Sequence, residues 1–320
     1  MNDGSKEVVL SDEFINTIWI FFKSKLSKRT QQEYFAVIKS FVKITGKDPL
    51  KITQQACEQY VTYLRTRMES NRLSYTTALM RISVMRTLCE YIKYTMNEKG
   101  YDYINYFNDI SLPDIDKTLK EDMLPSTDEL NNLLELTKNN SDSMAFLIFS
   151  LIIKCGLTSS EISNLNIEYI VLDINNNICI NFPPKKGVSR IIKLPDDISK
   201  LIDKYIEANN IYEGAVFLNK RHTRLKVRDA ERILNKYILI GQENGLIKKH
   251  FTMQSMRHAS IQYMLKGGAS EQAVANYTGI TTKWMSRYRR VVNSALLADA
   301  ADYNIRSEER RVGKECRSRW

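Results

Sequence analysis

The chain has 320 residues, enough for two domains that each bury a core. Its 47 Lys and Arg residues outnumber 37 Asp and Glu residues, and the resulting net charge of +10 favours an anionic partner. The longest mostly apolar run, residues 144–153, is about half of the roughly 20 residues that cross a bilayer. With no signal-like N-terminus either, we expect a cytoplasmic protein without a membrane partner.

Residues 306–320 read RSEERRVGKECRSRW and look like a translated sequencing adapter, an artefactual tail that we leave out of the fold prediction. Without its six basic and three acidic residues, the net charge falls from +10 to +7, so the chain stays basic. The other four cysteines lie far apart, and the three histidines lack metal-ligand spacing. We therefore expect buried thiols in a reducing compartment and no metal site.

Residues 1–100 predict a helical domain. Apolar residues recur at helical spacing after Thr30-x-x-Glu33, which resembles a capping box, after Thr53, and from Leu79 to Ile92. Basic residues crowd the turns between these helices, and we single out Lys28, Arg29 and Arg72 as candidate contacts to a DNA backbone. A solvated charged face is the alternative interpretation.

Residues 101–123 predict a linker, because helical periodicity fades there into a Tyr- and Asp-rich stretch. A second domain, residues 124–305, then begins with a capping-box pattern, Ser126-x-x-Glu129. Gly156 should end a strongly apolar helix, and Thr158-x-x-Glu161 should begin the next. The β-prone runs 177–182 and 190–194 flank a Pro- and Gly-containing turn. The predicted class is mainly α with a small β hairpin or sheet (α+β).

Arg257 and His258 lie about thirty residues before Tyr288. A phenol has a pKa near 10, so it attacks a phosphodiester only where cations stabilise the phosphate and its deprotonation is assisted. Arginine suits this task because its planar fork binds phosphate through two hydrogen bonds. The neighbouring Arg287 and Arg289 favour a phosphate-facing loop around Tyr288, although most tyrosines are core or interface residues.

A further basic run covers residues 220–228 and lies between predicted helices. Arg221, Arg224 and Lys226 are its candidate phosphate contacts, which would add affinity and salt dependence without choosing a sequence. A solvated loop is the alternative.

The order of elements over residues 10–300 resembles the tyrosine recombinase, or phage integrase, family. The motifs that carry the resemblance are Ser27-Lys-Arg-Thr30 with Tyr34, Ser74-Tyr-Thr-Thr77, Cys155-Gly-Leu-Thr-Ser-Ser-Glu-Ile162, Lys185-Lys-Gly-Val-Ser-Arg190, Met256-Arg-His258 and Tyr288. It implies an N-terminal helical core-binding (SAM-like) DNA-binding domain, a C-terminal catalytic domain, and double-stranded DNA as partner. It also implies self-assembly, as four protomers on two duplexes.

The resemblance also implies roles for individual residues. Arg257 would clamp the phosphate, Lys185 would protonate the leaving 5′ oxygen, and Tyr288 would form a 3′-phosphotyrosyl link. Lys186 replaces Lys185 if the hairpin shifts by one residue, and His258 would act chemically or pack. Neither a metal nor a nucleotide cofactor is required, because the phosphotyrosyl bond conserves the energy for religation.

Three family positions are vacant. Thr158 occupies the place of the first catalytic arginine, Gln254 that of a His or Lys, and Ile280 lies where a His or Trp is usual. Two functions follow, namely a site-specific recombinase that cleaves through Tyr288 and a DNA-binding homologue that no longer cleaves and has an architectural or regulatory role. A helical protein–protein module is a third, weaker alternative.

Overall fold

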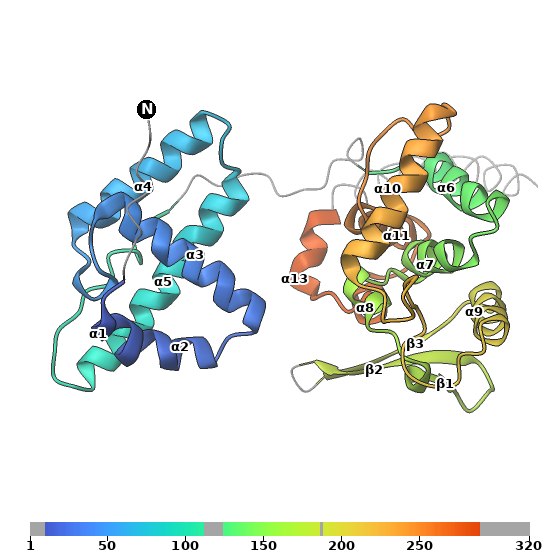
Figure 1. The fold of residues 1–320 in the computed structure, drawn as a ribbon, viewed down its shortest axis with the longest axis horizontal. Coiled ribbons are helices and arrows are strands. Elements are labelled where there is room, and N and C mark those ends of the chain that lie inside the picture. Colours follow the sequence, from blue (N-terminus) through green and yellow to red (C-terminus); the bar gives the residue numbers. More distant parts are fainter. Residues whose placement is uncertain (1–9, 112–123, 186–187, 289–320) are drawn as a thin grey trace, which may run out of the picture. The chain divides into compact units, whose positions relative to one another are not determined.

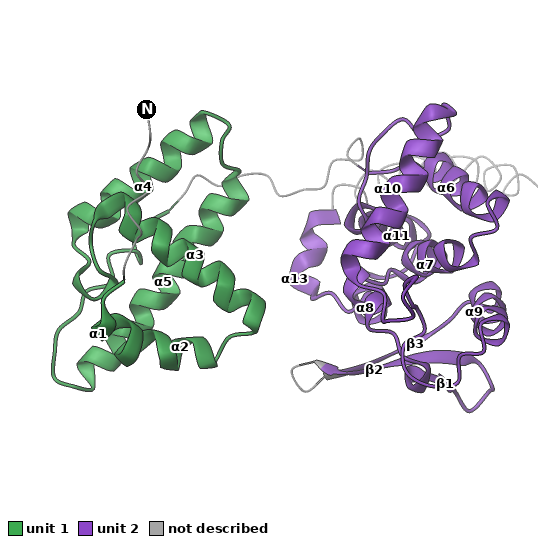
Figure 2. Ribbon diagram, in the orientation of Figure 1, with its two compact units in different colours: residues 1–115 green, residues 116–320 purple. Residues whose placement is uncertain are grey.

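The computed structural model describes residues 10–111, 124–185 and 188–288, with the side chains of Lys185 and Val188 left out. The chain divides into two compact units, residues 1–115 and residues 116–320, which Figure 2 shows in separate colours. Each unit has a hydrophobic core of its own.

Unit 1 is helical in its described part (Figure 1). Its elements are α1 (Asp12–Phe14), a π-helical turn (Ile15–Trp19), α2 (Ile20–Ser24), α3 (Lys28–Thr45), a 3-10 turn (Pro49–Lys51), α4 (Gln54–Glu69) and α5 (Tyr75–Asn97). The apolar faces of these helices meet in one core that includes Phe41, Tyr60 and Met85, all with no exposed side chain. Burial of such faces, rather than intrinsic helix propensity, stabilises helices of this length.

Each of the three longer helices of unit 1 begins at a side-chain cap. The hydroxyls of Ser27, Thr53 and Ser74 accept hydrogen bonds from the third backbone N–H that follows. The expected cap at Thr30 is therefore wrong by one turn, because Ser27 caps α3 and Thr30 lies in its first turn.

Residues 103–110, which we expected to belong to the linker, pack on unit 1. Phe107 is fully buried, with its ring 6.0 Å from that of Phe41. Arg86 donates to the carbonyls of Phe107 (3.0 Å) and Ile110 (2.7 Å), so polar groups hold this segment as well. The remainder of the expected linker, residues 112–123, lies outside the described residues.

Unit 2 is built around α7, whose apolar residues are buried on nearly all sides. Its helices are α6 (Thr127–Asn139), α7 (Ser143–Cys155), α8 (Ser159–Ser163), α9 (Asp196–Ala208), α10 (Val227–Glu243), α11 (Met253–Lys266), α12 (Glu271–Thr278) and α13 (Thr282–Met285). Short 3-10 turns cover Ile167–Tyr169 and Ser286–Tyr288. The expected capping boxes at Ser126 and Thr158 are both present, and Gly156 ends α7 in the left-handed conformation.

A three-stranded antiparallel sheet interrupts the helices of unit 2. Its strands, β1 (Ile170–Leu172), β2 (Ile178–Lys185) and β3 (Val188–Lys193), follow chain order. The β2–β3 register pairs Phe182 with Arg190, and an irregularity separates that pair from the pairing of Lys185 with Val188. The mainly helical fold with a small sheet is therefore confirmed. In the described part of the chain, no helix is long and apolar enough to cross a membrane.

We predict that Phe107→Ala lowers the free energy of unfolding by about 3–5 kcal/mol, because it removes a large buried side chain from a packed core. Urea unfolding of the full chain, followed by circular dichroism, measures this loss. Tyr101→Ala is the matched control, since Tyr101, two residues before this segment, is 67% exposed. Equal effects of the two substitutions would contradict the packing of residues 103–110 on unit 1.

Candidate functional site

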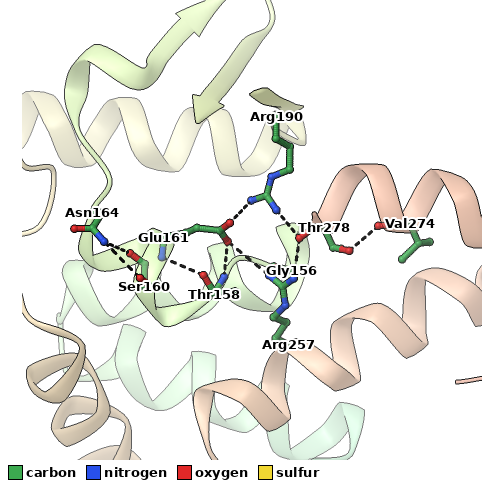
Figure 3. Close-up of polar contacts among 9 residues, drawn as sticks. All are labelled: Gly156, Thr158, Ser160, Glu161, Asn164, Arg190, Arg257, Val274 and Thr278. Atoms are coloured by element: carbon green, nitrogen blue, oxygen red, sulfur yellow. Dashed lines mark hydrogen bonds and ion pairs between the residues drawn. The ribbon is translucent and has the colours of Figure 1, made fainter. Parts of the chain in front are cut away.

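Arg257 lies on α11 and turns its guanidinium group into the interior of unit 2 (Figure 3). Only 4% of the residue is exposed. Nη2 donates to the carbonyl oxygen of Thr278 at 2.7 Å, Nη1 donates to that of Gly156, and Nη1 also lies 3.6 Å from Glu161 Oε2. The backbone at the ends of α7 and α12 therefore fixes the orientation of this cation.

Arg190 reaches the same place from β3 (Figure 3). Its Nη2 donates to Glu161 Oε1 at 2.8 Å, and its Nη1 donates to the Thr278 carbonyl that Arg257 also uses. The guanidinium carbon lies 4.6 Å from the ring centroid of Phe182, the cross-strand partner of Arg190. The hairpin register thus determines where this second cation lies.

Glu161 connects the two arginines to the first turn of α8. Its Oε2 accepts from the Thr158 backbone N–H at 2.8 Å, and the Thr158 hydroxyl accepts from the Glu161 N–H at 3.1 Å. Thr158 therefore serves as a helix cap in the position where the family resemblance implied an arginine. A capping box whose carboxylate also pairs with two arginines ties local helix formation to the geometry of the cations.

Gly279 is required by the close approach of Arg190. It ends α12 with φ +72°, and a Cβ atom there would lie 2.0 Å from Arg190 Nη1. A side chain at this position would both strain the backbone and displace the guanidinium group.

Tyr288 and His258 form a hydrogen-bonded pair beside these cations. Tyr288 Oη lies 2.5 Å from His258 Nδ1, and Tyr288 is only 3% exposed, in a small cluster with Ile261 and Met285. The other ring nitrogen, His258 Nε2, lies 3.1 Å from the amide nitrogen of Gln254. With that nitrogen as donor, the imidazole proton is on Nδ1, and turning the amide by 180° moves it to Nε2.

Both members of this pair are neutral near pH 7. Burial raises the pKa of Tyr288 to about 12, and the positive charges of Arg257 and Arg287 oppose that rise. Burial also lowers the pKa of His258 to about 4, and Arg287 and Arg257 contribute to the fall. The phenol therefore keeps its proton in this arrangement, while the neutral imidazole has one nitrogen able to accept it.

Several sequence-predicted residues lie elsewhere or outside the described part. Lys185 ends β2, but its side chain, like Lys186 and Arg289, lies outside the described residues. Ile280 is partly buried and packs against the cluster that contains Tyr288. The Arg287 guanidinium carbon lies 5.1 Å from the ring centroid of Trp284.

The candidate DNA-backbone contacts differ in exposure. Lys28, Arg29 and Arg72 are exposed in unit 1, and Arg29 forms an i,i+4 ion pair with Glu33. In unit 2, Arg221 and Lys226 are exposed. Arg224 instead donates to the Ser163 carbonyl (3.2 Å) and to Asn166 Oδ1 (2.6 Å), so part of its donor capacity connects its loop to the end of α8.

Arg190, Glu161 and Thr278 belong to this arrangement although we did not single them out as site residues. Glu161 was visible only as the third residue of a capping box, and Arg190 only as the last residue of a hairpin motif. Thr278 contributes a backbone carbonyl, which gives no sequence signal. The pairing of Phe182 with Arg190 depends on the hairpin register, which the sequence alone does not give.

We predict that acid weakens the folded state through His258. The folded protein keeps this side chain neutral down to a pKa of about 4, whereas the unfolded chain protonates it near 6.5, so the unfolded state binds more protons between these values. The free energy of unfolding therefore falls as pH drops from 7 towards 4, by up to about 3 kcal/mol from this group. Urea midpoints should depend less on pH in His258→Gln than in the wild-type chain.

His222→Gln, at an exposed histidine of the same unit, is the control and should keep the wild-type pH dependence. An unchanged slope in His258→Gln would show that other groups cause the acid sensitivity.

Comparison with known proteins agrees with the resemblance seen in the motifs. The model of the phage integrase family matches residues 126–292, more than half of the chain. A tyrosine recombinase of Pseudothermotoga lettingae is 24% identical over 262 residues, which cover 80% of this chain and 84% of that protein.

Two solved structures share the fold. The Tn1549 transposon integrase in complex with transposon right end DNA superposes with a TM-score of 0.68 at 13% identity, covering 90% of this chain and 98% of its own. A lambda integrase tetramer bound to a Holliday junction superposes with a TM-score of 0.59 at 14% identity, covering 86% of this chain and 76% of its own. The chain belongs to the phage integrase family of tyrosine recombinases.

Proposed function

We propose that this chain is a site-specific recombinase that cleaves and rejoins double-stranded DNA through Tyr288. The observation that carries the proposal is the 2.5 Å contact between Tyr288 Oη and His258 Nδ1, beside the guanidinium group of Arg257. A nucleophile in contact with a neutral base and near a fixed cation is the arrangement that phosphoryl transfer by a phenol requires.

In the proposed reaction, Tyr288 Oη attacks the phosphorus and the bond to the 5′ oxygen breaks, leaving a 3′-phosphotyrosyl link. His258 Nδ1 takes the phenol proton, which requires the Gln254 amide to present its oxygen to Nε2–H. Lys185 gives a proton to the departing 5′ oxygen, and Arg257 stabilises the charge on the phosphate. Attack by a 5′ hydroxyl on the phosphotyrosyl link reverses these steps and rejoins a strand, so no metal or nucleotide is consumed.

The buried state of Tyr288 sets a condition on this chemistry. At 3% exposure, the phenol must leave its cluster or DNA must reach it before attack. Its raised pKa means that proton transfer in the free protein is unfavourable. Once DNA is bound, stabilisation by arginine of the charge that develops on the attacked phosphate would supply the missing driving force, which makes cleavage dependent on DNA.

The proposed partners are duplex DNA and further copies of this chain. The net charge of +10 and the exposed Lys28, Arg29 and Arg72 support the first. The structural likeness to an integrase in complex with transposon DNA, and to an integrase tetramer on a Holliday junction, supports both. Such a protein would work in the cytoplasm, in contact with its DNA partner.

A DNA-binding homologue that does not cleave is the second candidate. It is favoured by Thr158, whose side chain is used as a helix cap, and by Gln254, which can donate and accept hydrogen bonds but cannot carry a proton. Ile280 adds an apolar residue where the family resemblance implies a His or Trp. Such a protein would keep the backbone contacts and act as an architectural or regulatory factor.

We predict that the wild-type chain forms a covalent DNA adduct that Tyr288→Phe cannot form, because the substitution removes the attacking oxygen. Residues 1–305 would be incubated with nicked DNA from the ends of the genetic element that encodes the protein, and products resolved on a denaturing gel. Tyr288→Phe should bind the same DNA with unchanged salt dependence. Salt-sensitive binding by the wild-type chain without any adduct would favour the non-cleaving homologue.

We also predict that deletion of residues 293–305 impairs assembly on DNA. This apolar, alanine-rich segment lies outside the described residues, and the family resemblance implies that it docks on a neighbouring protomer. Multi-angle light scattering of the complex with DNA should give a smaller assembly for the truncated chain, with binding of one protomer retained. An assembly of unchanged mass would contradict the prediction.

A further inference from the structure

The structure assigns to Arg190 the role of a second phosphate-binding arginine, which supplies from β3 the cation that position 158 lacks. This inference rests on the proposed DNA function, and it adds a second arginine to Arg257 as a ligand of the phosphate.

Arg190 and Arg257 share their acceptors. Arg190 and Arg257 come from different elements, β3 and α11, yet both donate to the carbonyl oxygen of Thr278 and both pair with Glu161 (Figure 3). Glu161 in turn accepts from the backbone N–H of Thr158. Glu161 therefore contacts both the Arg190 guanidinium group and position 158, where the family resemblance implied an arginine.

The two arginines are not fully neutralised by the carboxylate between them. Among the described residues, Glu161 is the carboxylate that pairs with these two guanidinium groups, so the cluster carries one excess positive charge. The adjacent imidazole of His258 adds no compensating charge, being neutral near pH 7. A partly buried excess charge is costly unless an anion neutralises it. A phosphodiester carries one negative charge and accepts hydrogen bonds from both arginines, so it complements the cluster.

Arg190 has N–H groups left for a ligand, and its side chain is held in one orientation. An arginine has five N–H donors, and the contacts described above use one on each terminal nitrogen of Arg190. The Arg190 side chain is 14% exposed, against 5% for that of Arg257, so a ligand can reach it. The Phe182 ring, the Gly279 backbone and Glu161 hold it in one orientation before any ligand binds.

A purely supporting role, in which Arg190 only holds Glu161 in place, predicts a different result from phosphate binding. Each phosphate contact contributes close to 0.9 to the slope of log affinity against log salt concentration on duplex DNA, so a lost contact is visible as a smaller slope. If Arg190 only holds Glu161, its substitution would lower the free energy of unfolding and leave the salt slope unchanged. Position 158 offers a rescue that only the proposed role predicts.

The experiment measures fluorescence anisotropy of a labelled duplex of about 40 base pairs with the full chain over a series of salt concentrations. We expect Arg190→Gln to lower the salt slope by about 1, as Arg257→Gln does, and Thr158→Arg to restore it in the Arg190→Gln background. Lys138→Gln, which removes an exposed charge paired with Glu135 on α6, is the control and should leave the slope unchanged. Arg190→Met, which keeps the packing on Phe182, replaces Arg190→Gln if the latter does not fold.

A slope that stays at the wild-type value in a folded Arg190 variant, while Arg257→Gln lowers it, would overturn the inference and leave the proposed function standing. A lowered slope that Thr158→Arg fails to restore would equally refute the substitution of one arginine for the other. A wild-type chain that does not bind the duplex even at low salt would instead contradict the proposed DNA function itself.

Discussion

The carboxylate of Glu161 is the contact on which the arrangement of unit 2 around the candidate site depends. It completes the cap of α8, receives Arg190 from β3 and lies 3.6 Å from Arg257 on α11. Three elements distant in the sequence are thus tied to one side chain. Because the carboxylate is partly buried, its attraction for two cations is stronger than that of a surface ion pair, and it also offsets the repulsion between them.

The arginines and Tyr288 are held in place by different kinds of contact. Backbone carbonyls, a glycine without room for a side chain and an aromatic ring determine where the arginines lie. Tyr288, by contrast, is held by a small apolar cluster and one hydrogen bond to a neutral imidazole. Two firmly held arginines thus lie near a buried phenol whose raised pKa keeps it protonated near pH 7.

Much of the fold could be predicted from the sequence, because its signals are local. Capping boxes at Ser126 and Thr158, the glycine after α7 and the β-prone runs around residues 183–187 each depend on a few adjacent residues. The contact between Tyr288 and His258 was not predicted, because the family resemblance implied a role for each residue but no pairing between them. The position of Arg190 was not predictable, because it depends on a hairpin register and on a backbone carbonyl 88 residues further along the chain. The start of α3 was misplaced because Ser27 and Thr30 are both residue types that cap helices well, and the structure uses Ser27.

The Thr278 carbonyl accepts hydrogen bonds from both arginines, and Tyr288 follows only ten residues later in the chain. Between them lie Gly279, Ile280, Thr281, the short helix α13 and the start of the 3-10 turn that contains Tyr288. A displacement of Tyr288 from its cluster would therefore act, through residues 279–287, on the peptide that orients the two arginines. The burial of Tyr288 and the orientation of the Arg190 and Arg257 guanidinium groups are thus linked by one short segment of backbone.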